Sequence, residues 1–190
     1  MKKTAFTIFL ILVFLVGAAY SITLNQNSKK GAFMDKKVLV AYFSLSGNTK
    51  FVAQKIKDKL NADIYEIKTV KKYPNSYNET VEIAKEEIQK NIPVEIEKPI
   101  DITPYDVIFI GTPAWWYTMA PAVKTFILNN NFEGKTIIPF VTHGGGGGYK
   151  IKEEMHQYAK NATVKEGFVV YSRGNSSLDN EIDKWLLKIK

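Results

Sequence analysis

The segment VLVAYFSLSGNT, residues 38–49, decides the fold because it leads from a buried strand into a helix through a short polar loop. Residues 38–43 form a near-continuous apolar run, which is the pattern of a strand covered on both faces of a parallel sheet. From Thr49 to Asn61, apolar residues recur at helical spacing. A strand, a tight loop and a helix in this order predict the start of an α/β fold.

Residues 44–49 predict an anion site between this strand and this helix. The first turn of a helix directs free backbone N–H groups and the positive end of its dipole at the preceding loop. Ser44, Ser46 and Thr49 add three hydroxyls, and these six residues lack the lysine of a GxxxxGK[ST] triphosphate loop. The loop therefore favours the phosphate monoester of a mononucleotide over ATP. Its Gly-Asn pair also suits a plain turn and helix cap, and the loop alone leaves that interpretation open.

The rest of the chain alternates between strand-like and helix-like segments. Apolar runs predict strands at residues 38–43, 63–70, 106–110, 136–141 and 163–170. Helical periodicity predicts helices at residues 49–61, 78–90, 121–129, 149–159 and 178–189. Five strands, each followed by a helix, predict a parallel sheet with helices on both faces.

Ligands of such open sheets bind at the carboxyl ends of the strands, where three loops of this chain are expected to meet. The three loops are residues 44–49, 112–118 and 142–149. The second loop contains Trp115, Trp116 and Tyr117, whose flat faces suit a planar heteroaromatic ligand. The alternative is that one or two of these rings fold back into the core.

The third loop, THGGGGGY, brings bare backbone to the same edge of the sheet. Five consecutive glycines allow a ligand to approach closely and permit unusual dihedral angles. A flexible linker is the alternative interpretation of this run. His143 lies at the rim of the loop and is either a hydrogen-bonding partner of the ligand or a plain polar residue.

The first 33 residues are expected to form a segment separate from the domain at residues 34–190. Two lysines precede the apolar run of residues 5–20, and a polar segment follows it, as in a secretory signal or an N-terminal membrane anchor. This pattern predicts a location in the cell envelope, with a link to the membrane if the segment is not cleaved. A start of translation at Met34 would instead give a cytoplasmic protein.

Composition excludes several other classes. The chain has no cysteine, so it offers no disulfide framework and no thiolate metal site, and its two histidines are far apart in the sequence. The formal charge is +7, of which four lysines in residues 1–33 carry +4, so that residues 34–190 carry +3. We therefore expect neither a metal site nor nucleic-acid binding. No GxSxG motif of a serine hydrolase occurs.

Taken together, the SLSGNT, GTPAWW and THGGGGGY segments resemble those of flavodoxins, in particular the short type with a Trp-Trp pair. The resemblance covers residues 36–190. It implies a flavodoxin-like three-layer sandwich with strand order 2-1-3-4-5 that binds FMN noncovalently. It also implies that residues 44–49 hold the ribityl phosphate and that Trp115 covers one face of the isoalloxazine, with Tyr149 near the second aromatic position.

The cofactor-binding residues expected on these grounds come from the three loops, and no catalytic residue is assigned. They are Ser44, Ser46, Gly47, Asn48, Thr49, Pro113, Ala114, Trp115, Trp116, Tyr117, Thr142, His143, Gly144, Gly145 and Tyr149.

The resemblance and the loops together predict an oxidoreductase that exchanges electrons with a redox partner protein or a small acceptor. The alternatives are an NAD(P)H-dependent FMN quinone or nitro reductase, with Trp116, Tyr117 and His143 lining an opening over the ring, and a non-redox envelope module that uses the phosphate pocket. The three loops contain no Asp or Glu, whereas electron-carrying flavodoxins are acidic around the flavin. We expect the missing repulsion to favour the fully reduced, anionic flavin.

Overall fold

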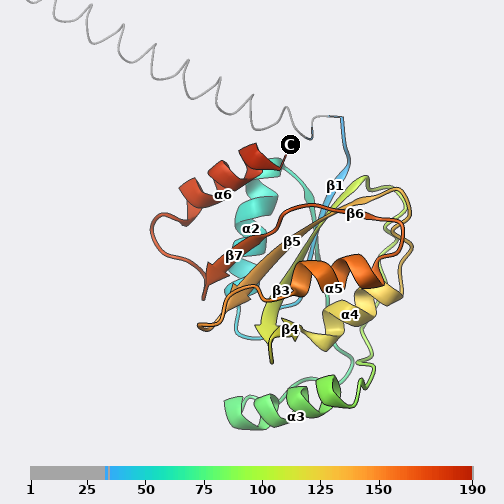
Figure 1. Cartoon of the computed structure of the whole chain (residues 1–190), viewed down its shortest axis with the longest axis vertical. Helices are drawn as coiled ribbons and strands as arrows, with labels where there is room; N and C mark the ends of the chain where they lie inside the picture. Colours follow the sequence, from blue (N-terminus) through green and yellow to red (C-terminus); the bar gives the residue numbers. More distant parts are fainter. Residues whose placement is uncertain (1–32, 34, 190) are drawn as a thin grey trace, which may run out of the picture.

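A mainly parallel sheet forms the centre of the molecule (Figure 1). The computed structural model describes residues 33 and 35–189. Its strands are β1 (Val38–Tyr42), β2 (Asp63–Glu66), β3 (Val107–Trp115), β4 (Thr118–Met119), β5 (Thr136–His143), β6 (Thr163–Val164) and β7 (Phe168–Tyr171). The order is β2-β1-β3-β5-β6, with β7 also paired to β5 and β4 antiparallel to β3. The predicted order 2-1-3-4-5 is confirmed: β5 is the fourth strand of the prediction, and β6 and β7 both pair with β5 in the place of the fifth.

Helices cover both faces of this sheet. They are α2 (Asn48–Leu60), α3 (Tyr77–Gln89), α4 (Pro121–Leu128), α5 (Ile151–Tyr158) and α6 (Leu178–Lys188). Alternate residues of β1 point to opposite faces, so that Val40 packs with α2 and α6 while Leu39 packs with α4 and α5. In Figure 1, α3 lies beyond the tip of β3, below α4. The predicted three-layer α/β sandwich is therefore present, and α3 reaches past one end of it.

The aromatic segment is a hairpin, so the prediction of a loop at residues 112–118 is wrong. Strand β3 continues through Trp115, and the chain turns at Trp116 and Tyr117 and returns as β4, with Trp115 opposite Thr118. Both turn residues have left-handed backbone, with φ values of 48° and 69°. Hairpin turns of this form normally carry Asn or Gly, and the absence of that signal explains why sequence reasoning missed the turn.

The predicted strand at residues 163–170 is divided into β6 and β7. In the ladder, the Lys165 N–H donates to the carbonyl of Ile137 at 2.9 Å. The next bond of a parallel ladder would come from the N–H of residue 139, and Pro139 has none. Pairing with β5 therefore stops at this point and resumes at Phe168.

The predicted signal or anchor at residues 1–33 lies outside the described residues, except for Phe33. Within residues 35–189, no helix has the length and apolar character needed to cross a bilayer.

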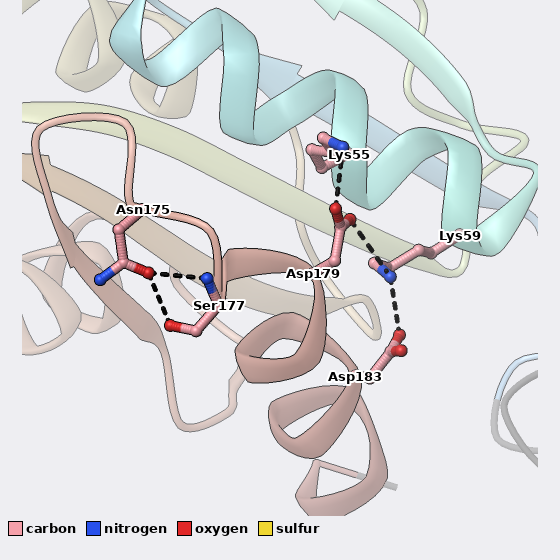
Figure 2. A network of polar contacts seen from close by, with 6 residues as sticks. All are labelled: Lys55, Lys59, Asn175, Ser177, Asp179 and Asp183. Atoms are coloured by element: carbon pink, nitrogen blue, oxygen red, sulfur yellow. Dashed lines mark hydrogen bonds and ion pairs between the residues drawn. The ribbon is translucent and has the colours of Figure 1, made fainter.

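An ion-pair network joins α2, which begins at the predicted phosphate loop, to α6 (Figure 2). The Lys55 ammonium lies 2.9 Å from a carboxylate oxygen of Asp179, and that of Lys59 lies 3.4 Å from Asp179 and 2.9 Å from Asp183. Just before α6, the side-chain oxygen of Asn175 accepts hydrogen bonds from the backbone N–H and the hydroxyl of Ser177. The hydrogen bond from Lys55 holds the pKa of Asp179 below its usual range. The network therefore helps to fix α2 in place.

The Asp179→Asn variant should be less stable than the wild type at pH 7 and low salt. Because the folded state lowers the pKa of Asp179, its contribution is present at neutral pH and is lost as the pH falls through the range in which carboxyl groups titrate. The side chain is half exposed, so we expect a loss of less than about 1 kcal/mol in urea unfolding. A difference that persisted unchanged at pH 2 or in 1 M salt would contradict this assignment.

Candidate functional site

A cavity of about 600 Å³ opens at the carboxyl ends of β1, β3 and β5, which is a typical size for a small-molecule site. All three predicted loops contribute to its wall. The predicted residues that line it are Ser46, Asn48, Pro113, Ala114, Trp115, Trp116, Tyr117, Thr142, His143, Gly144, Gly145 and Tyr149. The structure therefore brings together residues that are about 100 positions apart in the sequence.

Three predicted residues do not line the cavity. The Thr49 hydroxyl is buried and shares a hydrogen bond of 2.8 Å with the Thr142 hydroxyl, so it fastens α2 to β5 beneath the loop. The Ser44 hydroxyl oxygen is buried and has no hydrogen-bond partner among the described residues. Gly47 has a φ of 86°, a conformation that L side chains rarely adopt.

The amino end of α2 is uncapped. Gly47 occupies the cap position and offers no side-chain acceptor, and the first turn contains no acidic residue. By contrast, α3 has the Ser76 hydroxyl as a cap for the Glu79 N–H, with the acidic Glu79 in its first turn. The unshared N–H groups and the dipole of α2 are therefore available to an anion in the loop.

Trp115 is half-buried and lines the cavity, and its ring also packs against two other aromatic rings. It meets Phe43 and Tyr73 edge to face, with ring centroids 5.4 Å and 5.1 Å apart and interplanar angles of 90°. Tyr73 is anchored in turn by a 2.7 Å hydrogen bond to Glu87, and burial together with this bond raises its pKa. Trp115 therefore presents a ring in a fixed orientation.

The other two aromatic residues of the hairpin reach the neighbouring elements. The Trp116 indole N–H donates to the Val81 carbonyl at 3.1 Å, and the Lys85 ammonium lies 5.2 Å from the indole ring. The Tyr117 ring meets that of Tyr149 edge to face at 4.6 Å. The hairpin thus joins α3 on one side to the glycine loop on the other. Its left-handed turn residues carry strain of roughly 1 kcal/mol each, which is common at functional sites.

The glycine loop is organised by the residue that precedes it. The Nδ1 atom of His143 accepts hydrogen bonds from the N–H groups of Gly145 and Gly147, at 3.1 Å and 3.0 Å. The Tyr149 hydroxyl lies 1.2 Å from where a Cβ of Gly146 would be, so a side chain at that position would displace the tyrosine ring. The loop is therefore ordered by specific contacts, and the linker interpretation does not describe it.

Sequence reasoning missed part of the wall. The additional residues are Leu45, Tyr77, Thr80, Val81, Ala84, Gly146, Tyr171 and Ser172. Tyr171 and Ser172 lie at the carboxyl end of β7, so the rule that pointed to the other loops would have found them. Four others belong to α3, and no local pattern indicates that this helix reaches the strand ends.

The wall of the cavity is electrically neutral. It contains no Asp, Glu, Lys or Arg, and its ring-bearing residues are Tyr77, Trp115, Trp116, Tyr117, His143, Tyr149 and Tyr171. The absence of acidic residues noted for the three loops therefore extends to the whole cavity.

A second cavity of about 470 Å³ lies on the other side of the aromatic turn, and Trp116 and Tyr117 line both cavities. Its wall is mixed, with apolar residues beside the charged Glu87, Lys124 and Glu154. In it, the Glu154 carboxylate accepts from the Thr118 hydroxyl and from the Met119 N–H, and the Lys124 ammonium lies 4.6 Å from the Tyr158 ring.

Comparison with known proteins decides the family. The family model described as Flavodoxin matches residues 37–189. The chain belongs to the flavodoxin family. Among the described residues, no group of three or more His, Cys, Asp or Glu is placed to hold a metal ion.

Three solved structures resemble this flavodoxin. A protein assigned as a flavoprotein from Bacteroides eggerthii DSM 20697 is 29% identical, with a TM-score of 0.72, over 81% of this chain and 98% of that one. A second protein assigned as a flavoprotein, from Bacteroides uniformis ATCC 8492, is 26% identical, with a TM-score of 0.70, over 77% of this chain and 97% of that one. A flavoprotein from Lactobacillus acidophilus NCFM, solved in complex with FMN, is 28% identical, with a TM-score of 0.61, over 79% and 98%. No curated protein matches the chain significantly.

The residues of this flavodoxin fit a flavin cofactor. The cavity has the size of a small-molecule site, aromatic walls and no charge of its own, and an uncapped helix end lies beside it. The Ser44 hydroxyl is not committed to any partner within the described part of the chain. These features suit a planar ring system that carries an anionic tail.

Two hydroxyl deletions should separate structural from binding roles. Thr49→Val leaves the buried Thr142 hydroxyl without a partner, so we expect a loss of about 1–2 kcal/mol in unfolding free energy. Ser44→Ala removes a hydroxyl that has no partner, so its stability should change by less than about 0.5 kcal/mol. Urea denaturation of both variants measures this contrast, and equal losses would refute the placement of the two hydroxyls.

Proposed function

We propose that this flavodoxin binds FMN at the strand-end cavity and serves in electron transfer. The observation that carries the proposal is the neutral, aromatic cavity beside the uncapped end of α2. The related flavoprotein from Lactobacillus acidophilus, which was solved with FMN, supports the choice of this flavin.

The phosphate would be held by uncharged donors. Backbone N–H groups of the loop and of the first turn of α2, the exposed Ser46 hydroxyl and the Asn48 amide are the donors available there. The dipole of α2 adds a favourable interaction with the dianion, of roughly 0.3–1 kcal/mol at an exposed helix end. The Thr49 hydroxyl contributes indirectly, because its bond to Thr142 fixes the first turn.

The ring would be held between surfaces that this chain keeps in place. Trp115 is immobilised by its edge-to-face contacts with Phe43 and Tyr73, so little entropy is lost when a flat ligand packs against it. Tyr117 and Tyr149 touch each other at the rim and would shield the ring from water. When bound, FMN itself supplies hydride or single-electron chemistry, and the protein supplies binding and orientation.

An NAD(P)H-dependent quinone or nitro reductase is the second candidate function. The exposed rings of Trp116 and Tyr117 favour it, because they line the cavity together with His143, and a quinone or nitro compound could pack against them beside the flavin. Oxidation of NADH or NADPH that requires a quinone would identify this activity, and its absence would leave the carrier role.

The proposal also covers the redox partner of this flavodoxin and its location in the cell. We propose electron exchange with a redox partner protein or a small acceptor. We also propose a place in the cell envelope on the basis of residues 1–33, whose lysines and apolar run resemble a signal or anchor.

The test of FMN binding is a titration of FMN fluorescence with the wild type, Trp115→Phe and Trp115→Ala. We expect the alanine variant to lose at least about fivefold in affinity, since a ring contact is worth about 1 kcal/mol or more, and the phenylalanine variant to lose less. Thermal unfolding of each variant controls for the contacts with Phe43 and Tyr73.

Riboflavin, which lacks the phosphate, should bind the wild type much more weakly than FMN. A wild-type protein that binds no FMN would overturn the proposal and leave the non-redox binding module. Equal binding of FMN and riboflavin would show that the protein does not bind the phosphate, and would contradict the proposed phosphate site.

The neutral wall predicts a reduction potential less negative than that of acidic flavodoxins. Tyr117 is 66% exposed and lines the cavity, so Tyr117→Glu can add one carboxylate, with Tyr117→Gln as the neutral control. A repulsion of about 1 kcal/mol would lower the two-electron midpoint by roughly 20 mV relative to the glutamine variant. Equal midpoints of the two variants in a spectroscopic titration would contradict this electrostatic account.

A further inference from the structure

His143 has an unusual arrangement of hydrogen bonds for a residue on a ligand cavity. It is the last residue of β5, it is half-buried, and its side chain lines the cavity. Its Nδ1 atom does not face a carboxylate or a carbonyl oxygen. Instead, it accepts two backbone N–H groups, from Gly145 at 3.1 Å and from Gly147 at 3.0 Å.

This geometry fixes the protonation state of the imidazole. A ring nitrogen that accepts hydrogen bonds must keep its lone pair, so this arrangement requires a neutral imidazole with its proton on Nε2. If Nδ1 gains a proton it becomes a donor, and it then faces two donors across about 3 Å. Both hydrogen bonds are lost in that state, and the loop has to move away.

Little else holds the loop in its observed shape. Residues 144–148 are all glycine, so they have no side chains with which to anchor themselves. Gly145 and Gly147, the two donors, have φ values of 149° and 89°. Glycine adopts many other backbone conformations about as readily, so its own preference does not hold the loop in this shape. The other contacts of the loop are the Tyr149 hydroxyl beside Gly146 and, at its far end, the Val169 side chain beside Gly148 and the Ile151 N–H that donates to the Gly148 carbonyl.

The surroundings of His143 offer no compensation for a positive charge. Tyr171 on β7 packs its ring edge to face against the imidazole at 5.9 Å, and its neighbour Ser172 donates its backbone N–H to the His143 carbonyl at 2.8 Å. The wall of the cavity has no Asp, Glu, Lys or Arg, and its other titratable groups are the phenols of Tyr77, Tyr117, Tyr149 and Tyr171. Within residues 35–189, no carboxylate lies within ion-pair distance of the ring.

We propose that His143 is a positioning residue for the flavin: its neutral imidazole folds the glycine loop into the shape that binds FMN, and its protonation releases the loop and weakens binding. This inference rests on the proposed function of the cavity. In this arrangement the imidazole acts on the backbone of this chain, and the backbone then meets the cofactor.

Two substitutions isolate the acceptor atom. In His143→Asn, the side-chain Oδ1 is bonded to Cγ as Nδ1 is in histidine, so it can accept both N–H groups at every pH. In His143→Leu, a side chain of similar size has no acceptor. The asparagine variant should therefore restore most of the FMN affinity that the leucine variant loses.

The experiment is a measurement of the FMN dissociation constant of the full chain at pH 8 and pH 5 for the three proteins. Protonation of the phosphate monoester, whose second pKa is about 6, removes one of its charges and weakens binding at low pH in all of them. The asparagine variant measures that common effect. Between pH 8 and pH 5 the wild type should lose about tenfold more affinity than the asparagine variant, because proton uptake by the free protein competes with binding. The leucine variant should bind weakly at both pH values.

Equal pH dependence in the wild type and the asparagine variant, with FMN bound by both, would overturn the inference and leave the proposed function intact. If none of the three proteins binds FMN, the proposed function itself fails, and the role of His143 in binding fails with it.

A readout without FMN separates these cases further. In ¹⁵N NMR spectra of the ligand-free chain, the amide signals of Gly145 and Gly147 should shift between pH 8 and pH 5 in the wild type and stay in place in the asparagine variant. Signals that stay in place in the wild type would refute protonation-linked release of the loop.

Discussion

The close packing of β1, β3 and β5 is the constraint on which the site depends. At the carboxyl end of β1, Gly111 pairs with Tyr42 on one side and with Phe140 on the other. A Cβ on Gly111 would lie 2.1 Å from the Phe140 ring, so any larger residue would push the strands or the ring apart. Because the three strands are parallel, their carboxyl ends lie at the same edge of the sheet, and the segments that follow them surround one cavity.

Uncharged contacts hold the parts of these loops that line the cavity, while the Glu154 carboxylate holds the return strand of the hairpin from outside it. A pair of buried threonine hydroxyls joins the start of α2 to β5, an imidazole nitrogen organises the glycine loop, and edge-to-face ring contacts fix Trp115. Charged pairs lie farther out, as between α2 and α6. The result is a site that can receive a dianion and a flat ring system without bringing a fixed charge close to the ring.

Sequence patterns predict the parts of this structure that depend on local order. The apolar run of residues 38–43 and the helical spacing after it identify β1 and α2, and the loops at the strand ends supply twelve of the residues on the cavity wall. The strand order follows from the resemblance to flavodoxins. Sequence patterns do not predict a local conformation or contact that depends on residues far away in the sequence. Nothing near Trp116 indicates a left-handed turn, because the hairpin is fixed by pairing with β4 and by the bond to Val81 on α3. Likewise, the inward bond of Thr49 depends on Thr142, which is 93 positions away.

The most direct measurement is a crystal structure of the protein grown with FMN. The account predicts the phosphate against the N–H groups of residues 46–50, the ring packed on Trp115, and the His143 Nδ1 still bonded to the glycine loop. A phosphate bound away from the start of α2, or a ring that does not touch Trp115, would contradict the central claim that this neutral strand-end cavity is the flavin site.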